Sequence, residues 1–187
     1  MTVKDAQARV SFNIVFNSET EKAIRLLWKQ IAALDVEVPG VTGYRPHITL
    51  AVYDVVDYAP LESDIELAIA SASSFAVRLD SLGVFIDTGV VFLAPKMSQA
   101  MLSLHQKVIT CFRAAGRPEV VAEFLLPDFW APHVTLATFS ASDALSAAIE
   151  ACRSVWNPIH AIAEAVTMRV HPSTDDYRYF ALESSKD

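Results

Sequence analysis

YRPHITLA at residues 44–51 returns as WAPHVTLA at residues 130–137. Five of the eight positions are identical, and two others exchange one aromatic residue for another and Ile for Val. A repeat of this kind indicates that a structural unit has been duplicated. Each copy also falls on the second strand that hydrophobic alternation predicts in its half of the chain. We therefore interpret the two copies as equivalent positions of one duplicated unit.

Hydrophobic periodicity around the repeat predicts the remaining elements. Alternating apolar residues predict strands, and apolar residues three and four apart predict helices. The first helix should begin at Ser18, with Glu21 completing a capping box, and Ser98 should cap the third helix, which stops at Gly116. The predicted strands cover residues 10–16, 47–53, 75–82, 84–86, 90–93, 133–139, 162–170 and 177–182, and the predicted helices cover residues 18–34, 60–74, 98–116 and 142–155.

The order strand, helix, strand, helix, strand thus occurs twice, with one extra strand at the end. This order predicts an α+β fold: a bilobal pseudo-twofold duplication of a βαβαβ unit, with mostly antiparallel sheets, helices outside and a central cleft. No linker rich in Pro, Gly or Ser separates the halves. We therefore expect residues 1–187 to form a single domain, with lobes at approximately 10–89 and 90–187.

The composition limits the partners of the chain. Its formal net charge is −7, and it contains no run of Lys and Arg. Since phosphate neutralisation supplies most non-specific nucleic-acid affinity, we expect a small nucleotide or one end of a nucleic acid, and no long nucleic-acid track. No apolar run reaches the roughly 18–20 residues of a membrane span, and a signal peptide is not expected. Cys111 and Cys152 form no CxxC pair, which predicts a reduced, cytoplasmic protein.

Strand geometry defines what the repeated motif presents. Side chains alternate between faces, so His47 and Thr49 project together, as do His133 and Thr135. A single histidine in a strand is more often structural than catalytic, but two equivalent His-x-Thr pairs favour a functional site. Metal binding is the rival interpretation. It is disfavoured, because no carboxylate or further histidine lies at ligand spacing.

These residues resemble the 2H phosphoesterase superfamily, which includes 2′–5′ RNA ligases and cyclic nucleotide phosphodiesterases. The signature of that family is a pair of His-hydrophobic-Thr/Ser-hydrophobic motifs, and residues 47–50 and 133–136 match it. The expected hairpin at residues 82–93 and the closing strands are also similar to the family pattern. The chain departs from the family in being acidic, since members that act on RNA are often basic.

The resemblance implies an enzyme that needs no metal or other cofactor. His47 and His133 would be the acid and the base that open a 2′,3′-cyclic or related cyclic phosphodiester of a nucleotide or RNA 3′ end. Thr49 and Thr135 would bind the phosphate oxygens. The sequence does not assign acid and base to particular histidines. The alternatives are a 2′–5′ RNA ligase or transesterase, and a nucleotide-binding module with little turnover.

Further candidates for substrate contacts, with weaker support than the motif residues, lie beside the motifs, in the predicted hairpin and in the closing strands: Arg45, Tyr44, Phe85, Trp130 and Tyr177. An Arg directly before the first motif is able to reach phosphate, although it is as often exposed to solvent. The aromatic side chains are able to stack on a base, but beside strands they more often pack. Arg169 is a weaker candidate. The remaining histidines lack a His-x-Thr partner and are expected to be structural or exposed: His105, His160 and His171.

Overall fold

In the computed structural model, the described residues form three helices and one seven-stranded antiparallel sheet, which confirms the predicted α+β class. The structure describes residues 8–33, 38–39, 43–55, 57–114, 125–139, 146, 149–150, 152–153 and 157–184. The elements in chain order are β1 (Ala8–Phe16), α1 (Ser18–Ala32), β2 (His47–Val55), α2 (Ala59–Ile69), β3 (Phe75–Phe85), β4 (Val90–Pro95), α3 (Gln99–Ala114), β5 (Val134–Thr138), β6 (Ile159–His171) and β7 (Arg178–Ala181).

The strand order, β2-β1-β6-β3-β4-β5, repeats the duplication in mirror order. In each half the motif strand pairs with the first strand, as β2 does with β1 and β5 with β4. The third strand of each half pairs with the first strand of the other half, so β6 lies beside β1 and β3 beside β4. The two third strands meet in the centre of the sheet. The topology therefore has the pseudo-twofold symmetry that the repeated motif predicted.

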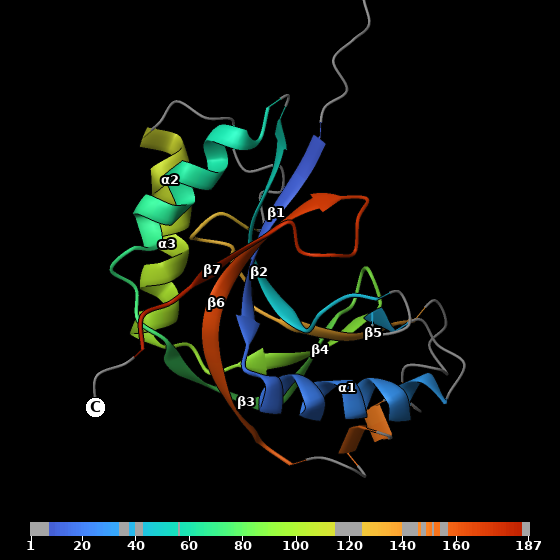
Figure 1. The fold of residues 1–187 in the computed structure, drawn as a ribbon. Helices are drawn as coiled ribbons and strands as arrows, with labels where there is room; N and C mark the ends of the chain where they lie inside the picture. Colours follow the sequence, from blue (N-terminus) through green and yellow to red (C-terminus); the bar gives the residue numbers. More distant parts are fainter. Residues whose placement is uncertain are drawn as a thin grey trace, which may run out of the picture.

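One long strand joins the two lobes. β6 pairs with β1 through residues 163–171 and with β3 through residues 159–163, so both lobes share one continuous sheet. Figure 1 shows β6 as a curved strand that runs through the centre of the fold. Because the third strands are exchanged, each half of the chain, 10–89 and 90–187, contributes strands to both sides of this sheet. β7 pairs with β6 on residues 165–168, beyond the end of the β3 pairing.

Helix α1 is capped by a different residue from the one that the sequence predicted. Asn17 is the N-cap, and its side chain accepts a hydrogen bond of 3.1 Å from the Thr20 backbone N–H. Asn at this position satisfies a backbone donor that the first turn of the helix leaves without a partner. The side chain of Glu21 does not complete a capping box with Ser18, because it pairs with Arg45. The helix begins at Ser18, as predicted.

Helices α2 and α3 pack side by side, and α1 lies apart from them (Figure 1). The first helix of each half contacts the motif strand of the other half, α1 with β5 and α3 with β2. Ser98 caps α3 as predicted, since its Oγ accepts from the Met101 N–H at 3.2 Å. The predicted end at Gly116 and most of the predicted helix 142–155 lie outside the described residues. Within the described residues, no helix is long and apolar enough to cross a membrane.

The hairpin between β3 and β4 is tied to the end of the second motif strand. Gly89 has a φ of +67°, a conformation that residues with a Cβ rarely adopt. Its carbonyl oxygen accepts a hydrogen bond of 3.0 Å from the Phe139 N–H. An added Cβ would lie 2.0 Å from the Phe139 carbonyl oxygen, so only glycine fits this approach. The contact places the end of β3 beside the second motif.

Candidate active site

The two motif strands carry the same irregularity at the same motif position. The pairing of β2 with β1 skips Leu50, and the pairing of β5 with β4 skips Leu136. Each leucine directly follows its motif threonine, so both motifs contain a β-bulge at the same place. Bulges re-aim neighbouring side chains and are frequent beside active sites. The duplication thus extends to the local backbone geometry.

Side-chain burial follows the predicted alternation. Residues on one face of the motif strands are 0–1% exposed and belong to the hydrophobic core: Ile48, Leu50, Val134 and Leu136. The residues between them are half-buried and face the other way: His47, Thr49, His133 and Thr135. Each motif therefore presents one imidazole and one hydroxyl on a strand that is anchored in the core.

The backbone holds both motif histidines in the same way. His47 Nδ1 lies 2.6 Å from the Arg45 carbonyl oxygen, and His133 Nδ1 lies 2.8 Å from the Ala131 carbonyl oxygen. A carbonyl oxygen only accepts, so these contacts assign the proton to Nδ1 in each ring. In the neutral imidazole, Nε2 then keeps its lone pair for proton transfer. The proline that precedes each histidine restricts the local backbone and so helps to direct the carbonyl.

Burial lowers the pKa of both rings, and the shift is larger for His47. Its pKa falls from 6.5 to about 4, mainly because of burial. The Arg169 guanidinium and His133 lower it further, while the Arg45 carbonyl and the Asp176 carboxylate act in the opposite direction. The pKa of His133 is also lowered by burial. At neutral pH the His47 ring is therefore neutral, and its Nε2 lone pair is available.

The fold brings the two motifs to one place. β2 and β5 stand at the two ends of the strand order, yet they are in contact. His133 lies close enough to His47 for its charge to lower the pKa of the His47 ring. This juxtaposition agrees with the central site that the repeat predicted.

Two phenylalanines pack against the His133 ring. Phe85 meets it edge to face, with ring centroids 4.9 Å apart and an interplanar angle of 88°, and Phe92 lies 5.3 Å away. Gly83 makes room for this cluster, because an added Cβ would lie 2.3 Å from the Phe92 ring. Phe85, a candidate for base stacking, thus contacts the second motif histidine and contributes to the burial that lowers its pKa.

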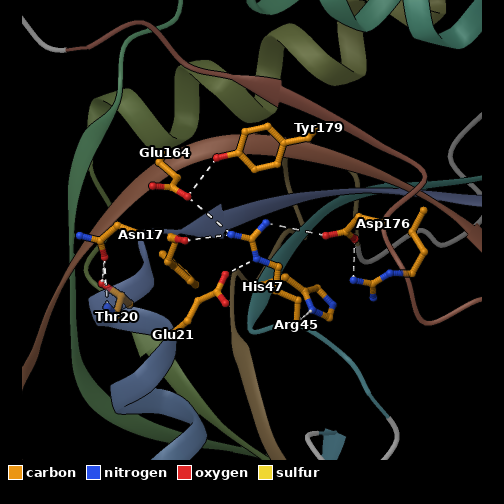
Figure 2. A network of polar contacts seen from close by, with 10 residues as sticks. Asn17, Thr20, Glu21, Arg45, His47, Glu164, Asp176 and Tyr179 are labelled. Atoms are coloured by element: carbon orange, nitrogen blue, oxygen red, sulfur yellow. Dashed lines mark hydrogen bonds and ion pairs between the residues drawn. The ribbon is translucent and has the colours of Figure 1, made fainter.

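Arg45 lies at the centre of a polar network beside the first motif (Figure 2). Its guanidinium forms ion pairs with Glu21, with Glu164 at 3.5 Å and with Asp176 at 4.0 Å. It also lies 5.6 Å from the centroid of the Tyr179 ring. The three carboxylates come from α1, from β6 and from the segment between β6 and β7. Arg45, predicted as a phosphate contact, is therefore engaged by protein carboxylates.

Arg169 extends this network under the first motif. Its side chain is 1% exposed, and its Nη2 donates a hydrogen bond of 2.8 Å to Asp176. The guanidinium carbon lies 4.8 Å from the centroid of the Tyr44 ring, and Tyr44 in turn lies 6.3 Å from the His47 ring. Together with Arg45, two guanidinium groups face three carboxylates here, so the network carries one net negative charge.

The other two aromatic candidates differ in burial. Trp130 is 8% exposed and stacks on the buried His105, with ring centroids 3.9 Å apart and an interplanar angle of 1°. Its indole N–H donates to the Thr49 carbonyl oxygen at 3.0 Å. Tyr177 is 49% exposed and leans edge to face on Tyr58 beside α2. Trp130 is thus placed to pack between the motifs, and Tyr177 has an open surface.

Sequence reasoning did not single out three neighbours of the motifs: Trp28, Phe92 and Asp176. Trp28 lies within the predicted helix 18–34, and its indole N–H donates to the Thr135 carbonyl oxygen at 2.9 Å. A buried indole N–H generally needs an acceptor, and that was the available signal. Phe92 is the cross-strand partner of Thr135 in the pairing of β4 with β5. Predicting this contact would have required the register between these two strands, which the sequence does not give. Asp176 belongs to no periodic or repeated stretch of the sequence, so no local signal marked it.

Comparison with known proteins places most of the chain in one family. A family model described as the 2′–5′ RNA ligase superfamily matches residues 21–175. The ligand-free crystal structure of Escherichia coli LigT has a TM-score of 0.59 and 19% identity, and the match covers 95% of this chain and 99% of that chain. A crystal structure described as a phosphoesterase has a TM-score of 0.59 and 18% identity, and the match again covers 95% of this chain and 99% of that chain. A crystal structure of a Thermus thermophilus protein has a TM-score of 0.56 and 16% identity, and the match covers 95% of this chain and 100% of that chain. No curated protein sequence matches the chain.

Proposed function

The chain belongs to the 2′–5′ RNA ligase superfamily, and we propose that it opens a cyclic phosphodiester of a nucleotide or RNA end by two-histidine acid–base catalysis. The resemblance to 2H phosphoesterases that the motifs predicted is confirmed at the level of the superfamily. One observation carries the proposal. Both motif histidines donate Nδ1–H to a backbone carbonyl, which leaves both Nε2 atoms for proton transfer.

Opening a 2′,3′-cyclic phosphate requires one proton to be removed and another to be delivered. The base takes a proton from water while the water oxygen bonds to phosphorus. The acid gives its proton to the ribose oxygen as the bond from that oxygen to phosphorus breaks. His47 suits the base, because burial, and to a smaller extent the nearby Arg169 guanidinium, lower its pKa and favour its neutral form. His133 is then the acid.

The same constellation would join two ends by a 2′–5′ bond if a ribose 5′ hydroxyl, in place of water, attacked the cyclic phosphate while the bond from phosphorus to the 3′ oxygen broke and that oxygen took a proton. The description of the family favours this as the second candidate. Both reactions use one phosphodiester group and the same proton transfers. They differ in whether water or a ribose hydroxyl attacks phosphorus. A nucleotide-binding module with little turnover is the remaining alternative.

A comparison of two substrates tests the function. We expect turnover of a nucleoside 2′,3′-cyclic phosphate to a monoester, and slower cleavage of 2′–5′-linked oligonucleotides. The reaction should persist in excess EDTA, because two imidazoles and two hydroxyls supply the acid, the base and the anion contacts. Within the described residues, no group of three or more His, Cys, Asp or Glu side chains is placed to hold a metal ion. Turnover that EDTA abolishes and only a divalent ion restores would contradict the mechanism.

The pH dependence of kcat/KM should separate the roles of the two histidines. As pH rises through about 4, His47 loses its proton and becomes a competent base, so kcat/KM should rise. As pH rises further, His133 loses the proton that it must deliver, so kcat/KM should fall at a pH below the ordinary 6.5. The residual activity of His47→Ala should lack the acidic limb, and that of His133→Ala the alkaline limb. The opposite pattern would exchange the two roles.

Substrate size should matter little, because the charges beside the site do not favour a second phosphate. The network around Arg45 has one excess carboxylate, and the chain carries a net charge of −7. Crystal structures of LigT, which is similar in fold, are described with 3′-AMP, ATP and phosphate, all small ligands. These points support a small nucleotide or one end of a nucleic acid as the substrate.

A salt titration of binding checks this expectation. The apparent affinity for a cyclic mononucleotide and for a long oligonucleotide with the same end should have similar log–log slopes against salt, about −0.7 for one contacted phosphate. The value follows from roughly −0.7 per single-strand phosphate that the protein contacts. A slope several-fold steeper for the oligonucleotide would reveal a basic track and would refute the small-substrate proposal.

A further inference from the structure

Each motif threonine accepts a hydrogen bond from one tryptophan in the opposite half of the chain. Trp28 of α1 donates from Nε1 to the Thr135 carbonyl oxygen of β5, at 2.9 Å. Trp130, just before β5, donates from Nε1 to the Thr49 carbonyl oxygen of β2, at 3.0 Å. The bonded residues are 107 and 81 positions apart in sequence. Both hydrogen bonds therefore cross between the duplicated halves.

The two carbonyls have a common reason to need such a partner. Thr49 and Thr135 each directly precede the extra residue of a β-bulge, where the ladder of backbone hydrogen bonds is disrupted. Their strands, β2 and β5, also stand at the two ends of the strand order, where one edge of each strand is open to other partners. A carbonyl in such a place is satisfied by a side-chain donor. The indole N–H groups supply these donors.

Both indole rings are held firmly. Trp28 is 3% exposed, and the Arg25 guanidinium lies 5.7 Å from its ring centroid. Trp130 stacks in parallel on His105, whose Nε2 in turn lies 2.9 Å from the Leu125 carbonyl oxygen. A tryptophan side chain has only two rotatable bonds, so packing of this kind leaves its N–H in one direction. Each bond is therefore anchored at both ends.

We propose that Trp28 and Trp130 are positioning residues that set the separation of the two motifs, and hence hold His47 and His133 on opposite sides of the phosphate. The proposal rests on the two-histidine mechanism. In the strand order the motif strands are separated by all the other strands of the path, so no backbone ladder among the described residues sets the distance between them. The Trp130 bond joins the two motifs directly, and the Trp28 bond holds the second motif against α1, which follows β1, the pairing partner of the first motif strand. A misplacement of about 1 Å between catalytic groups can lower a rate by about 10²-fold.

The test removes each indole N–H and keeps the size of the ring. Position 28 or 130 is replaced, one at a time, by 3-benzothienylalanine, in which sulfur stands where the N–H was. We expect kcat on a nucleoside 2′,3′-cyclic phosphate to fall by about tenfold or more, with a change of less than about threefold in KM. The proposal is overturned if the unmodified protein turns over and both analogues keep its kcat. If the unmodified protein itself shows no turnover, the proposed function fails instead.

A double replacement separates positioning from general loosening. Because both indole bonds are proposed to set one separation, losing the second bond should cost much less kcat than losing the first. Such non-additivity is expected only for residues that act together. The folded fraction of each protein is measured by circular dichroism at the assay temperature. Fully multiplicative losses, or losses that follow the folded fraction, would show that the tryptophans merely stabilise the fold, and would refute the positioning role.

Discussion

His47→Ala and His133→Ala should each lower kcat on the best phosphodiester substrate by about 10²–10⁴-fold, because each removes one proton-transfer partner. The double variant should lose far less than the product of the two single effects, since the pair acts as a unit. KM should change little, because the threonines and the substrate base still contribute to binding. The measurement is steady-state turnover of a nucleoside 2′,3′-cyclic phosphate by the purified variants.

The chain offers a matched control for these variants. His160 lies on β6 and is exposed, so His160→Ala makes the same chemical change away from the motifs. It should keep the kcat of the unmodified protein. Near-normal turnover by both motif variants would remove the histidines from the mechanism. That result would leave the nucleotide-binding alternative as the better interpretation.

Thr49→Val and Thr135→Val should each lower kcat by about 10²–10³-fold, if each hydroxyl donates to a non-bridging phosphate oxygen whose charge grows in the transition state. Valine has nearly the shape of threonine and favours strands, so the backbone of the motif should be retained. The loss should appear in kcat more than in KM, because the contact strengthens in the transition state. Steady-state kinetics on the same cyclic nucleotide measures both constants.

Thr138→Val is the control for the threonine variants. Thr138 lies on β5, the strand of the second motif, but its side chain is exposed. The substitution therefore tests whether a β-branched apolar residue on this strand affects turnover by itself. It should not. Equal losses in Thr135→Val and Thr138→Val would point to a disturbed strand, and would contradict a phosphate contact through Thr135.

The sequence by itself determined the motif geometry and the fold class. His47 with Thr49, and His133 with Thr135, share a face because side chains alternate along any strand, whatever surrounds it. The repeat predicted a duplicated unit, and the strand order confirms it. These properties depend on residues a few positions apart, so periodicity alone records them. The Ser18 cap was wrong by one residue, because Asn17 competes for the same backbone donors.

Only the tertiary structure decided which distant groups meet these motifs. The carboxylates around Arg45 come from separate parts of the chain, so the sequence could not show that this guanidinium is already paired. The exchange of third strands, the bulge after each motif threonine and the bonds of Trp28 and Trp130 to the opposite motif depend on long-range packing. Such contacts leave no periodic trace, because hydrophobic patterning reports which face of an element is buried and not what lies against it.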